Sequence, residues 1–141
     1  MQAVALSCIT RRWAAPLALG VAIGAGSVHF SYAQQQPIKR TPLIKTDLTN
    51  VEGKEVLMTV IEAASGAAFP RHFHHGDEFI YVIDGALELS VAGKGEAAPK
   101  TGELVHVPRE QAHSGKAISA TKFLSVHIID KGKPFSQPVK E

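Results

Sequence analysis

The most constraining feature of this chain is the stretch from Gly66 to Gly85, which combines closely spaced histidines with strand-forming residues. His72 and His74 are two residues apart, and side chains at that spacing on a β-strand point to the same face. Glu78 follows a short polar turn and begins an apolar run to Ile83 that predicts the next strand. The turn therefore folds a carboxylate back towards two neighbouring imidazoles.

Strand-forming segments recur through the rest of the chain, separated by turn residues. Leu87, Leu89 and Val91 alternate with polar residues, which is the period of a half-buried strand, and Asp84-Gly85 is a hairpin signal. Strands are expected at 55–63, 67–74, 78–83, 86–92, 104–107 and 121–129. No segment keeps a helical period for three turns, so the pattern favours an all-β sandwich or barrel.

The first 33 residues have the pattern of an export signal. Arg11 and Arg12 precede an uncharged stretch from Trp13 to Val28, and Ser31-Tyr32-Ala33 places small residues at the two positions that a signal peptidase reads. We therefore expect cleavage after Ala33 and an exported protein, periplasmic or secreted.

Two alternatives for this segment stay open. An uncleaved membrane anchor is disfavoured, because the apolar stretch is short for a bilayer of about 30 Å and is interrupted by Pro16 and several glycines. The paired arginines resemble a twin-arginine signal, but Trp13-Ala14-Ala15 lacks the strongly apolar pair that usually follows them. Ordinary secretion is therefore the favoured interpretation.

Removal of residues 1–33 changes the charge and the redox character of the chain. Two of its 15 basic side chains lie in the signal, so 13 basic side chains remain against 13 acidic ones, and the single cysteine, Cys8, is lost. A fold without cysteine has no disulfide. Because no basic patch is visible, we expect no nucleic-acid partner, and we expect membrane contact only through the signal segment.

The expected organisation is a signal peptide at 1–33, a leader and first strand region at 34–54, a β-barrel at 55–130 and a tail at 131–141. Residues 34–40 are polar and aperiodic, so they are interpreted as a flexible leader. Phe79, Tyr81 and Ile83 fall on the outer face of their strand, where an apolar surface needs a cover. We therefore expect a homodimer that covers this face.

The stretch from Gly66 to Gly85 matches a known sequence motif. Gly66, His72, His74, Glu78 and Gly85 occupy every fixed position of the first sequence motif of the cupin superfamily, with the gaps of that motif. Across this stretch the chain resembles small single-domain cupins of the quercetin-dioxygenase-like type.

The second cupin motif is matched at Gly102, Pro108 and His113. Two positions depart from it, because Glu110 stands where the family has glycine and Ala117 stands where it has asparagine. The first departure concerns the geometry of a turn, and the second concerns a residue that is not a metal ligand.

The resemblance implies a double-stranded β-helix, or jelly-roll barrel, with a metal inside it held by His72, His74, Glu78 and His113. Three imidazoles and a carboxylate leave two positions of an octahedron open for water or substrate. Burying these four polar side chains without a metal would cost several kcal/mol. The donors suit Fe, Mn, Ni, Cu or Zn as the divalent metal, and no thiolate is present to choose among them.

Three other residues are candidates for a substrate pocket. His106 is flanked by valines, and its parity does not decide between an inward and an outward side chain. His127 is expected to have a structural role or to line the mouth of the barrel, and Arg71 flanks a ligand in sequence. His75 has the opposite parity to His74 and is expected to face away, and Glu110 is expected to be a solvent-facing loop residue.

Several functions are compatible with such a site. The first is a metal-dependent enzyme, dioxygenase-like, acting on a small organic molecule that chelates through oxygen. A metal-dependent isomerase, decarboxylase or hydrolase uses the same donors as a Lewis acid site. A non-catalytic cupin that binds metal or a small ligand is a further alternative, because a fold does not determine a function.

Overall fold

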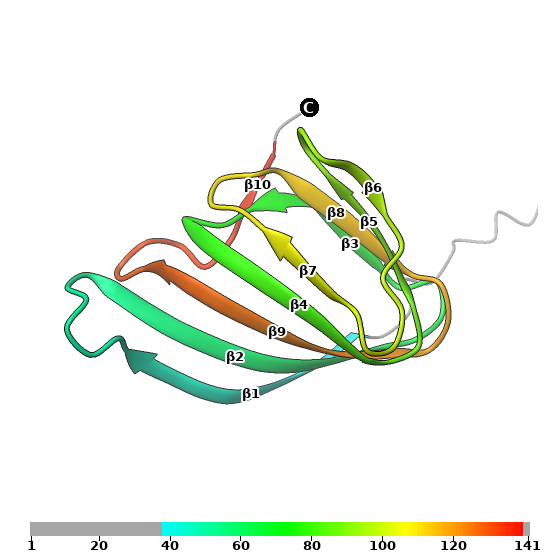
Figure 1. The fold of residues 1–141 in the computed structure, drawn as a ribbon, viewed down its shortest axis with the longest axis horizontal. Coiled ribbons are helices and arrows are strands. Elements are labelled where there is room, and N and C mark those ends of the chain that lie inside the picture. The colour runs from blue at the N-terminus through cyan, green and yellow to red at the C-terminus, as the bar shows by residue number, and fades with distance from the viewer. Residues whose placement is uncertain (1–37, 140–141) are drawn as a thin grey trace, which may run out of the picture. The chain divides into compact units, whose positions relative to one another are not determined.

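Strands form where β-branched and aromatic residues alternate with polar ones, because such side chains pack well on a pleated surface. The computed structural model describes residues 38–139, and within this range the chain forms ten strands and no helix (Figure 1). The strands are β1 (Ile38–Asp47), β2 (Lys54–Ala63), β3 (Ala68–Phe73), β4 (Gly76–Asp84), β5 (Leu87–Val91), β6 (Gly95–Ala97), β7 (Leu104–Val107), β8 (His113–Ala117), β9 (Thr121–Asp130) and β10 (Gln137–Pro138).

The strands pair into two antiparallel sheets of five strands each. Sheet A has the order β1-β2-β9-β4-β7, and sheet B has the order β10-β3-β8-β5-β6 (Figure 1). Sheet A contributes Ile61, Val82 and Phe123 to a common buried core, and sheet B contributes Leu87 and Leu89. The two sheets therefore face each other across one core, which confirms the all-β jelly roll expected from the sequence.

Burial alternates along the central strand β9, so its side chains divide between the two faces of sheet A. Ser125 and His127 are buried, as is every second residue of the strand. β4 pairs with β9 and repeats the alternation, with Glu78 buried and Phe79 half-buried on the opposite face. The period of two thus directs three polar side chains into the barrel interior.

Gly76, the first residue of β4, lies against the backbone of β9. A Cβ atom at this position would clash with the carbonyl oxygen of Ile128 and would lie 2.5 Å from the Cα atom of Ile129. Glycine is therefore required for the close approach of the two strands. The close approach allows β4, which begins two residues after His74, to pair with β9 in sheet A.

Both ends of the described segment belong to the sheets. β1 begins at Ile38, inside the range interpreted as a flexible leader up to Arg40, and pairs with β2 along its length. The C-terminal tail adds β10 to the edge of sheet B by pairing with β3. The expected signal peptide at 1–33 lies outside the described residues. Within 38–139, no helix has the length and hydrophobicity that crossing a membrane requires.

Candidate metal centre

Two cross-strand pairs of polar side chains face the barrel interior, one in each sheet. In sheet B, His72 lies directly opposite His113, with ring centroids 4.3 Å apart. In sheet A, Glu78 lies directly opposite His127. His74, in the turn between β3 and β4, contacts members of both pairs. We call these five side chains the histidine–glutamate cluster.

A bulge in β3 sets the pairing of His72 with His113. Phe69 lies opposite Gly115, so three residue steps on β3 match only two on β8. The extra residue falls around Pro70, which cannot donate a hydrogen bond to the ladder. The bulge therefore shifts the register of β3 by one residue, which places His72 opposite His113.

Each of the three predicted histidine ligands is held by a backbone carbonyl at Nδ1. His72 donates to the carbonyl of Pro70 at 2.7 Å, and His113 donates to that of Gln111 at 2.9 Å. His74 donates to the carbonyl of Phe135 at 2.6 Å. Because a carbonyl oxygen only accepts, Nδ1 carries the proton in each ring and Nε2 of the neutral ring presents a lone pair.

These Nε2 atoms lie close to one another, and those of His74 and His113 lie close to Glu78. The Nε2 atoms of His72 and His74 are 3.1 Å apart, although neither carries a proton in the neutral tautomer. Nε2 of His113 lies 3.1 Å from Oε2 of Glu78, and Nε2 of His74 lies 3.4 Å from the same oxygen. Lone pairs at these distances repel each other unless a cation lies among them.

The two carboxylate oxygens of Glu78 have different surroundings. Oε1 accepts a hydrogen bond from the Ser125 hydroxyl at 2.7 Å and lies 3.3 Å from Nε2 of His127. Oε2 is the single buried side-chain polar atom of the described residues that has no hydrogen-bond partner. A buried carboxylate oxygen without a partner is costly, and a metal ion is a group that would satisfy it.

The electrostatics of the cluster favour a positive charge beside Glu78. Burial raises the pKa of Glu78, but the close contacts with the imidazoles of His113, His127 and His74 outweigh it and hold that pKa well below its usual range. Burial and the neighbouring imidazoles lower the pKa of His72. Burial opposes protonation of His113 too, but the contact with Glu78 raises its pKa. The carboxylate thus attracts a cation to this point, whether a proton or a metal.

The cluster fits a divalent metal. The donor atoms of His72, His74 and His113 lie within 4.8 Å of one another, as do those of His74, Glu78 and His127. Imidazole nitrogen with carboxylate oxygen is a donor set that first-row divalent metals accept. Each imidazole is also oriented through its second nitrogen, as is usual for histidine ligands.

The structure brings together all four residues predicted as ligands, but it separates the three pocket candidates. His127 is buried within the cluster, its ring centroid 4.5 Å from that of His74. Arg71 is exposed in the bulge of β3. His127 is thus closer to the site than expected, and Arg71 lies at the surface.

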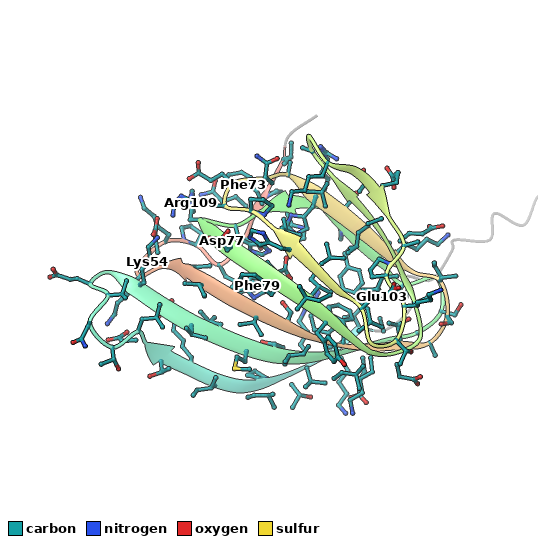
Figure 2. The ribbon with its side chains drawn as sticks, viewed as in Figure 1. Lys54, Phe73, Asp77, Phe79, Glu103 and Arg109 are labelled. Atoms are coloured by element: carbon teal, nitrogen blue, oxygen red, sulfur yellow. The ribbon has the colours of Figure 1, made fainter. Side chains whose placement is uncertain are left out.

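His106 does not line the barrel interior. It lies opposite Phe79 on the outer face of sheet A, with the two rings stacked at 4.7 Å. Its Nε2 is 2.7 Å from Oδ1 of Asp77, which lies on β4 with Phe79 (Figure 2). The register of β7 on β4 turns the flanking valines inward, so the open question about His106 is resolved as an outward side chain.

The turn at Glu110 keeps the backbone geometry of a glycine. Its φ of 60° lies in the left-handed region, and its amide donates to the carbonyl of His74 at 2.9 Å. The Glu110 side chain is exposed, as expected, and lies 3.4 Å from Nδ1 of His75. His75 also contacts Gln137 and takes no part in the cluster.

Sequence reasoning did not identify Ser125 and Phe135 as parts of the site. Ser125 shares the inward face of His127 two residues away, which is a signal that spacing alone could have given. Phe135 acts through its backbone carbonyl and its ring, which lies 5.0 Å from the ring of His74 and 4.7 Å from that of His127. No pattern in the sequence marks such a contact.

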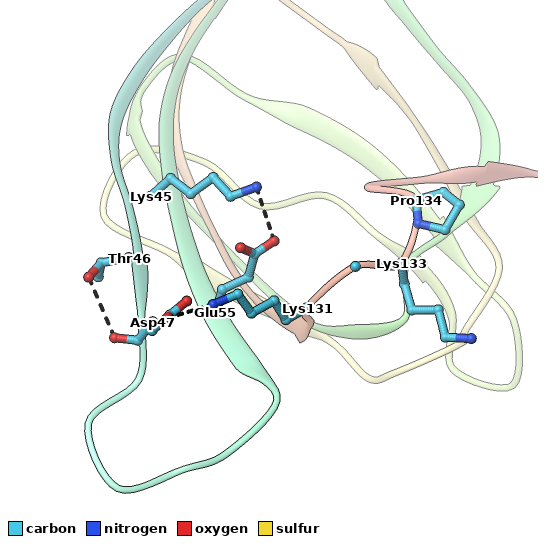
Figure 3. Close-up of a pocket in the computed structure, with 8 residues that line it drawn as sticks. Lys45, Thr46, Asp47, Glu55, Lys131, Lys133 and Pro134 are labelled. Atoms are coloured by element: carbon cyan, nitrogen blue, oxygen red, sulfur yellow. Dashed lines mark hydrogen bonds and ion pairs between the residues drawn. The ribbon is translucent and has the colours of Figure 1, made fainter.

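A surface hollow elsewhere in the structure is filled with ion pairs. It lies between the ends of β1 and β2 and the turn after β9 (Figure 3). Lys45 lies 3.2 Å from Glu55, and Lys131 donates to Asp47 at 2.6 Å. Its lining residues include no member of the histidine–glutamate cluster, so the hollow is separate from the candidate metal centre.

Comparison with known proteins agrees with the fold. A family model described as the cupin domain matches residues 48–127. A comparison with curated protein sequences finds no match. A conserved protein of unknown function from Streptococcus pyogenes has a similar structure, with 18% identity, a TM-score of 0.58 and coverage of 70% of this chain and 80% of the other.

Two further solved structures share the architecture. A cupin superfamily protein from Desulfitobacterium hafniense is 16% identical, with a TM-score of 0.59 and coverage of 70% of this chain and 83% of the other. A salicylate 1,2-dioxygenase from Pseudaminobacter salicylatoxidans is 13% identical, with a TM-score of 0.54 and coverage of 64% and 26%. The family match covers more than half of the sequence, and the chain therefore belongs to the cupin family.

Proposed function

We propose that this protein is an exported cupin that binds one divalent transition metal through His72, His74, Glu78 and His113. The observation that carries the proposal is the convergence of the Nε2 lone pairs of His74 and His113 on the unpartnered Oε2 atom of Glu78, with Nε2 of His72 3.1 Å from that of His74. Protein groups leave this arrangement unsatisfied, and a divalent cation satisfies all of it at once. Export itself rests on the signal pattern of residues 1–33.

The residues around the ligands orient them. Ser125 and His127 occupy Oε1 of Glu78, so Oε2 is left to the metal. Carbonyl groups hold the three imidazoles with Nε2 inward. The apolar wall beneath the cluster includes Val107, which lies opposite Glu78 and excludes water from that side.

We further propose that the protein is a metal-dependent enzyme, dioxygenase-like, that acts on a small organic molecule with adjacent oxygen donors. His72, His74, Glu78 and His113 would hold the ion, and a redox-active metal bound there would supply activation of dioxygen and of a chelating substrate. One structural neighbour is named a salicylate dioxygenase, but that likeness concerns the fold. His127, buried beside Glu78, is placed to hold a proton at Nε2 or Nδ1 during turnover.

Metal analysis of the purified protein after reconstitution tests the binding site. We expect about one metal per chain in the unaltered protein and less than about 0.2 in the double variant His72→Ala with His74→Ala. His106→Ala is the matched control, because it removes a histidine of the outer face and is expected to leave the metal content unchanged. A metal content that survives the double substitution contradicts the proposed site.

Oxygen consumption tests the reaction. The protein loaded with Fe, Mn, Ni, Cu or Zn is offered catechols, flavonols and β-dicarbonyl compounds in turn. Uptake of oxygen with one redox metal and one substrate class supports the dioxygenase proposal. Full metal occupancy without uptake in any combination favours a non-catalytic or non-oxidative cupin instead.

We also propose that the protein is a homodimer in solution. The outer face of sheet A carries Phe79, Leu124 and Val126, which are half-buried, and Tyr81, which is 42% exposed. An apolar sheet face of this kind is usually covered. Sedimentation at micromolar concentration is expected to give twice the mass of one chain, and Tyr81→Glu is expected to lower it. A monomer in the unaltered protein contradicts the proposal.

A further inference from the structure

The segment after β9, residues 131–139, crosses from one sheet to the other. It leaves sheet A at the end of β9 and reaches sheet B as β10 (Figure 1). On the first side, the amide of Lys131 donates to the carbonyl of Gly53 at 2.9 Å. On the second side, Gln137 pairs with Phe73. The segment is therefore anchored at both ends, and it lies outside the region that matches the cupin domain.

Phe135 lies between these two anchors and contacts the histidine–glutamate cluster in two ways. Its carbonyl oxygen accepts the Nδ1 proton of His74 at 2.6 Å. Its ring lies beside the rings of His74 and His127, and 46% of the residue remains exposed. Phe135 thus forms the boundary between these two histidines and solvent.

His74 depends on this segment in a way that His72 and His113 do not. The Nδ1 partners of His72 and His113 are carbonyls two residues earlier in the sequence. The partner of His74 is 61 residues away in sequence. The orientation and the tautomer of His74 are therefore fixed by tertiary structure, and those of the other two histidines are fixed locally.

We propose that residues 131–139 act as a clasp on the metal centre, in which the Phe135 carbonyl holds His74 with Nε2 inward and the Phe135 ring slows release of the metal. Phe135 is a positioning residue in this proposal, because it acts through His74. Without the carbonyl, His74 is free to rotate and to exchange its proton between the two ring nitrogens, which weakens it as a ligand. The inference rests on the proposed metal site, but the tautomer of His74 is a property of the metal-free protein.

The first experiment measures that tautomer by nitrogen NMR of the imidazole rings in the metal-free protein. In the full chain, His72, His74 and His113 are expected to be protonated at Nδ1 when neutral. A chain that ends at Pro134 is expected to show a mixture of tautomers at His74 alone. His72 and His113 serve as internal controls, since unchanged signals from them show that the barrel is intact. An unchanged His74 in that chain overturns the proposal.

The second experiment measures metal release from the full-length protein into an excess of chelator. Phe135→Ala retains the carbonyl and removes the ring, so we expect release to be about three-fold to ten-fold faster while the tautomer of His74 is unchanged. Shortening the chain to Pro134 is expected to weaken metal affinity about 10-fold to 100-fold, as loss of an orienting partner usually does. Lys133→Ala, an exposed position on the same segment, is the matched control and is expected to change neither value.

The outcomes separate this proposal from the metal site itself. If the full chain binds no metal, the proposed function fails, and the NMR measurement still decides whether the segment orients His74. If the shortened chain does not fold, Phe135→Ala decides the matter. A release rate equal to that of the unaltered protein in that variant overturns the clasp.

Discussion

Glu78 and His127 lie directly opposite each other on adjacent strands, and their side chains meet inside the barrel with Oε1 and Nε2 3.3 Å apart. Ser125 completes the arrangement by donating to the same oxygen at 2.7 Å. This contact decides which carboxylate oxygen is free, because the occupied Oε1 leaves Oε2 facing His74 and His113. The orientation of the acidic ligand is therefore set by two residues of β9.

Ser125→Ala tests this orienting role. Removal of a fully buried hydroxyl that bonds a carboxylate is expected to lower the free energy of unfolding by about 1–3 kcal/mol and metal affinity by about ten-fold. Chemical denaturation and metal titration measure the two effects. Ser119→Ala, in an exposed turn, is the matched control with no expected effect on either. Full metal affinity in Ser125→Ala would show that the hydroxyl of Ser125 is not needed to orient Glu78.

Gly76→Ala tests the close approach of β4 to β9. The added methyl group clashes with the backbone of Ile128 and Ile129, which cannot move aside as a flexible side chain can. We expect the free energy of unfolding to fall by about 2 kcal/mol or more, as overpacking does at a tight contact. Gly132→Ala is a useful comparison, because a Cβ there meets no atom within 4 Å and its cost is confined to the strain of its positive φ. Equal losses in the two variants would contradict the steric argument.

The left-handed turn at Glu110 predicts that glycine at this position gives a more stable protein than valine does. Glu110→Gly removes the strain of a positive φ but adds freedom to the unfolded chain, so we expect a change in unfolding free energy of less than about 1 kcal/mol. Glu110→Val places a β-branched residue in the same conformation and is expected to cost about 1–2 kcal/mol. Thermal unfolding of the two variants measures the difference. A valine variant as stable as the glycine variant would show that the turn relaxes to another conformation.

The stability of the protein is expected to fall in acid through Asp130. Arg109 and Lys54 donate to its carboxylate at 2.6 and 2.5 Å and lower its pKa well below the usual range. A depressed pKa in the folded state gives stabilisation that is complete above the unfolded pKa of about 3.9 and is lost as the pH falls below it. Asp130→Asn lacks this contribution. Denaturation of both proteins between pH 7 and pH 2 is expected to show a difference that narrows below about pH 4.

The stability difference between these two proteins does not narrow in acid if the ion pairs of Asp130 contribute no stability. A stability difference that is constant across the pH range would show that the substitution acts through packing. Glu52→Gln is a suitable control, since Glu52 is an exposed carboxylate in the turn between β1 and β2.

Short-range patterns in the sequence predicted six of the ten strands, and the cupin motifs implied the four ligands. The alternation at Leu87, Leu89 and Val91 predicted β5, and the spacing of His72 and His74 predicted two imidazoles on one side. These inferences succeed because the period of a strand is local and needs no knowledge of its neighbours. The N-terminal strand was harder to find, because β1 is exposed along most of its length and lacks an apolar stripe.

The pocket candidates show where this reasoning stops. His106 and His127 both stand between apolar residues in the sequence, yet one faces solvent and the other lies in the cluster. The difference comes from register, because His106 pairs with Phe79 and His127 pairs with Glu78. A shift of one residue would exchange the two faces. Register depends on packing between distant segments, which a local pattern does not contain.

The sequence by itself predicted the all-β fold class from strand periodicity, and its two motifs carried the resemblance to cupins that implied the four donor residues. Both signals are local, because each depends on residues close together in the chain. Only the tertiary structure decided that His127 and Ser125 orient Glu78, and that the carbonyl of Phe135 orients His74. A backbone carbonyl is present at every residue, so the sequence does not show which carbonyl accepts a particular hydrogen bond. Its role appears only when the chain from sheet A returns to sheet B and brings that carbonyl against an imidazole 61 residues away.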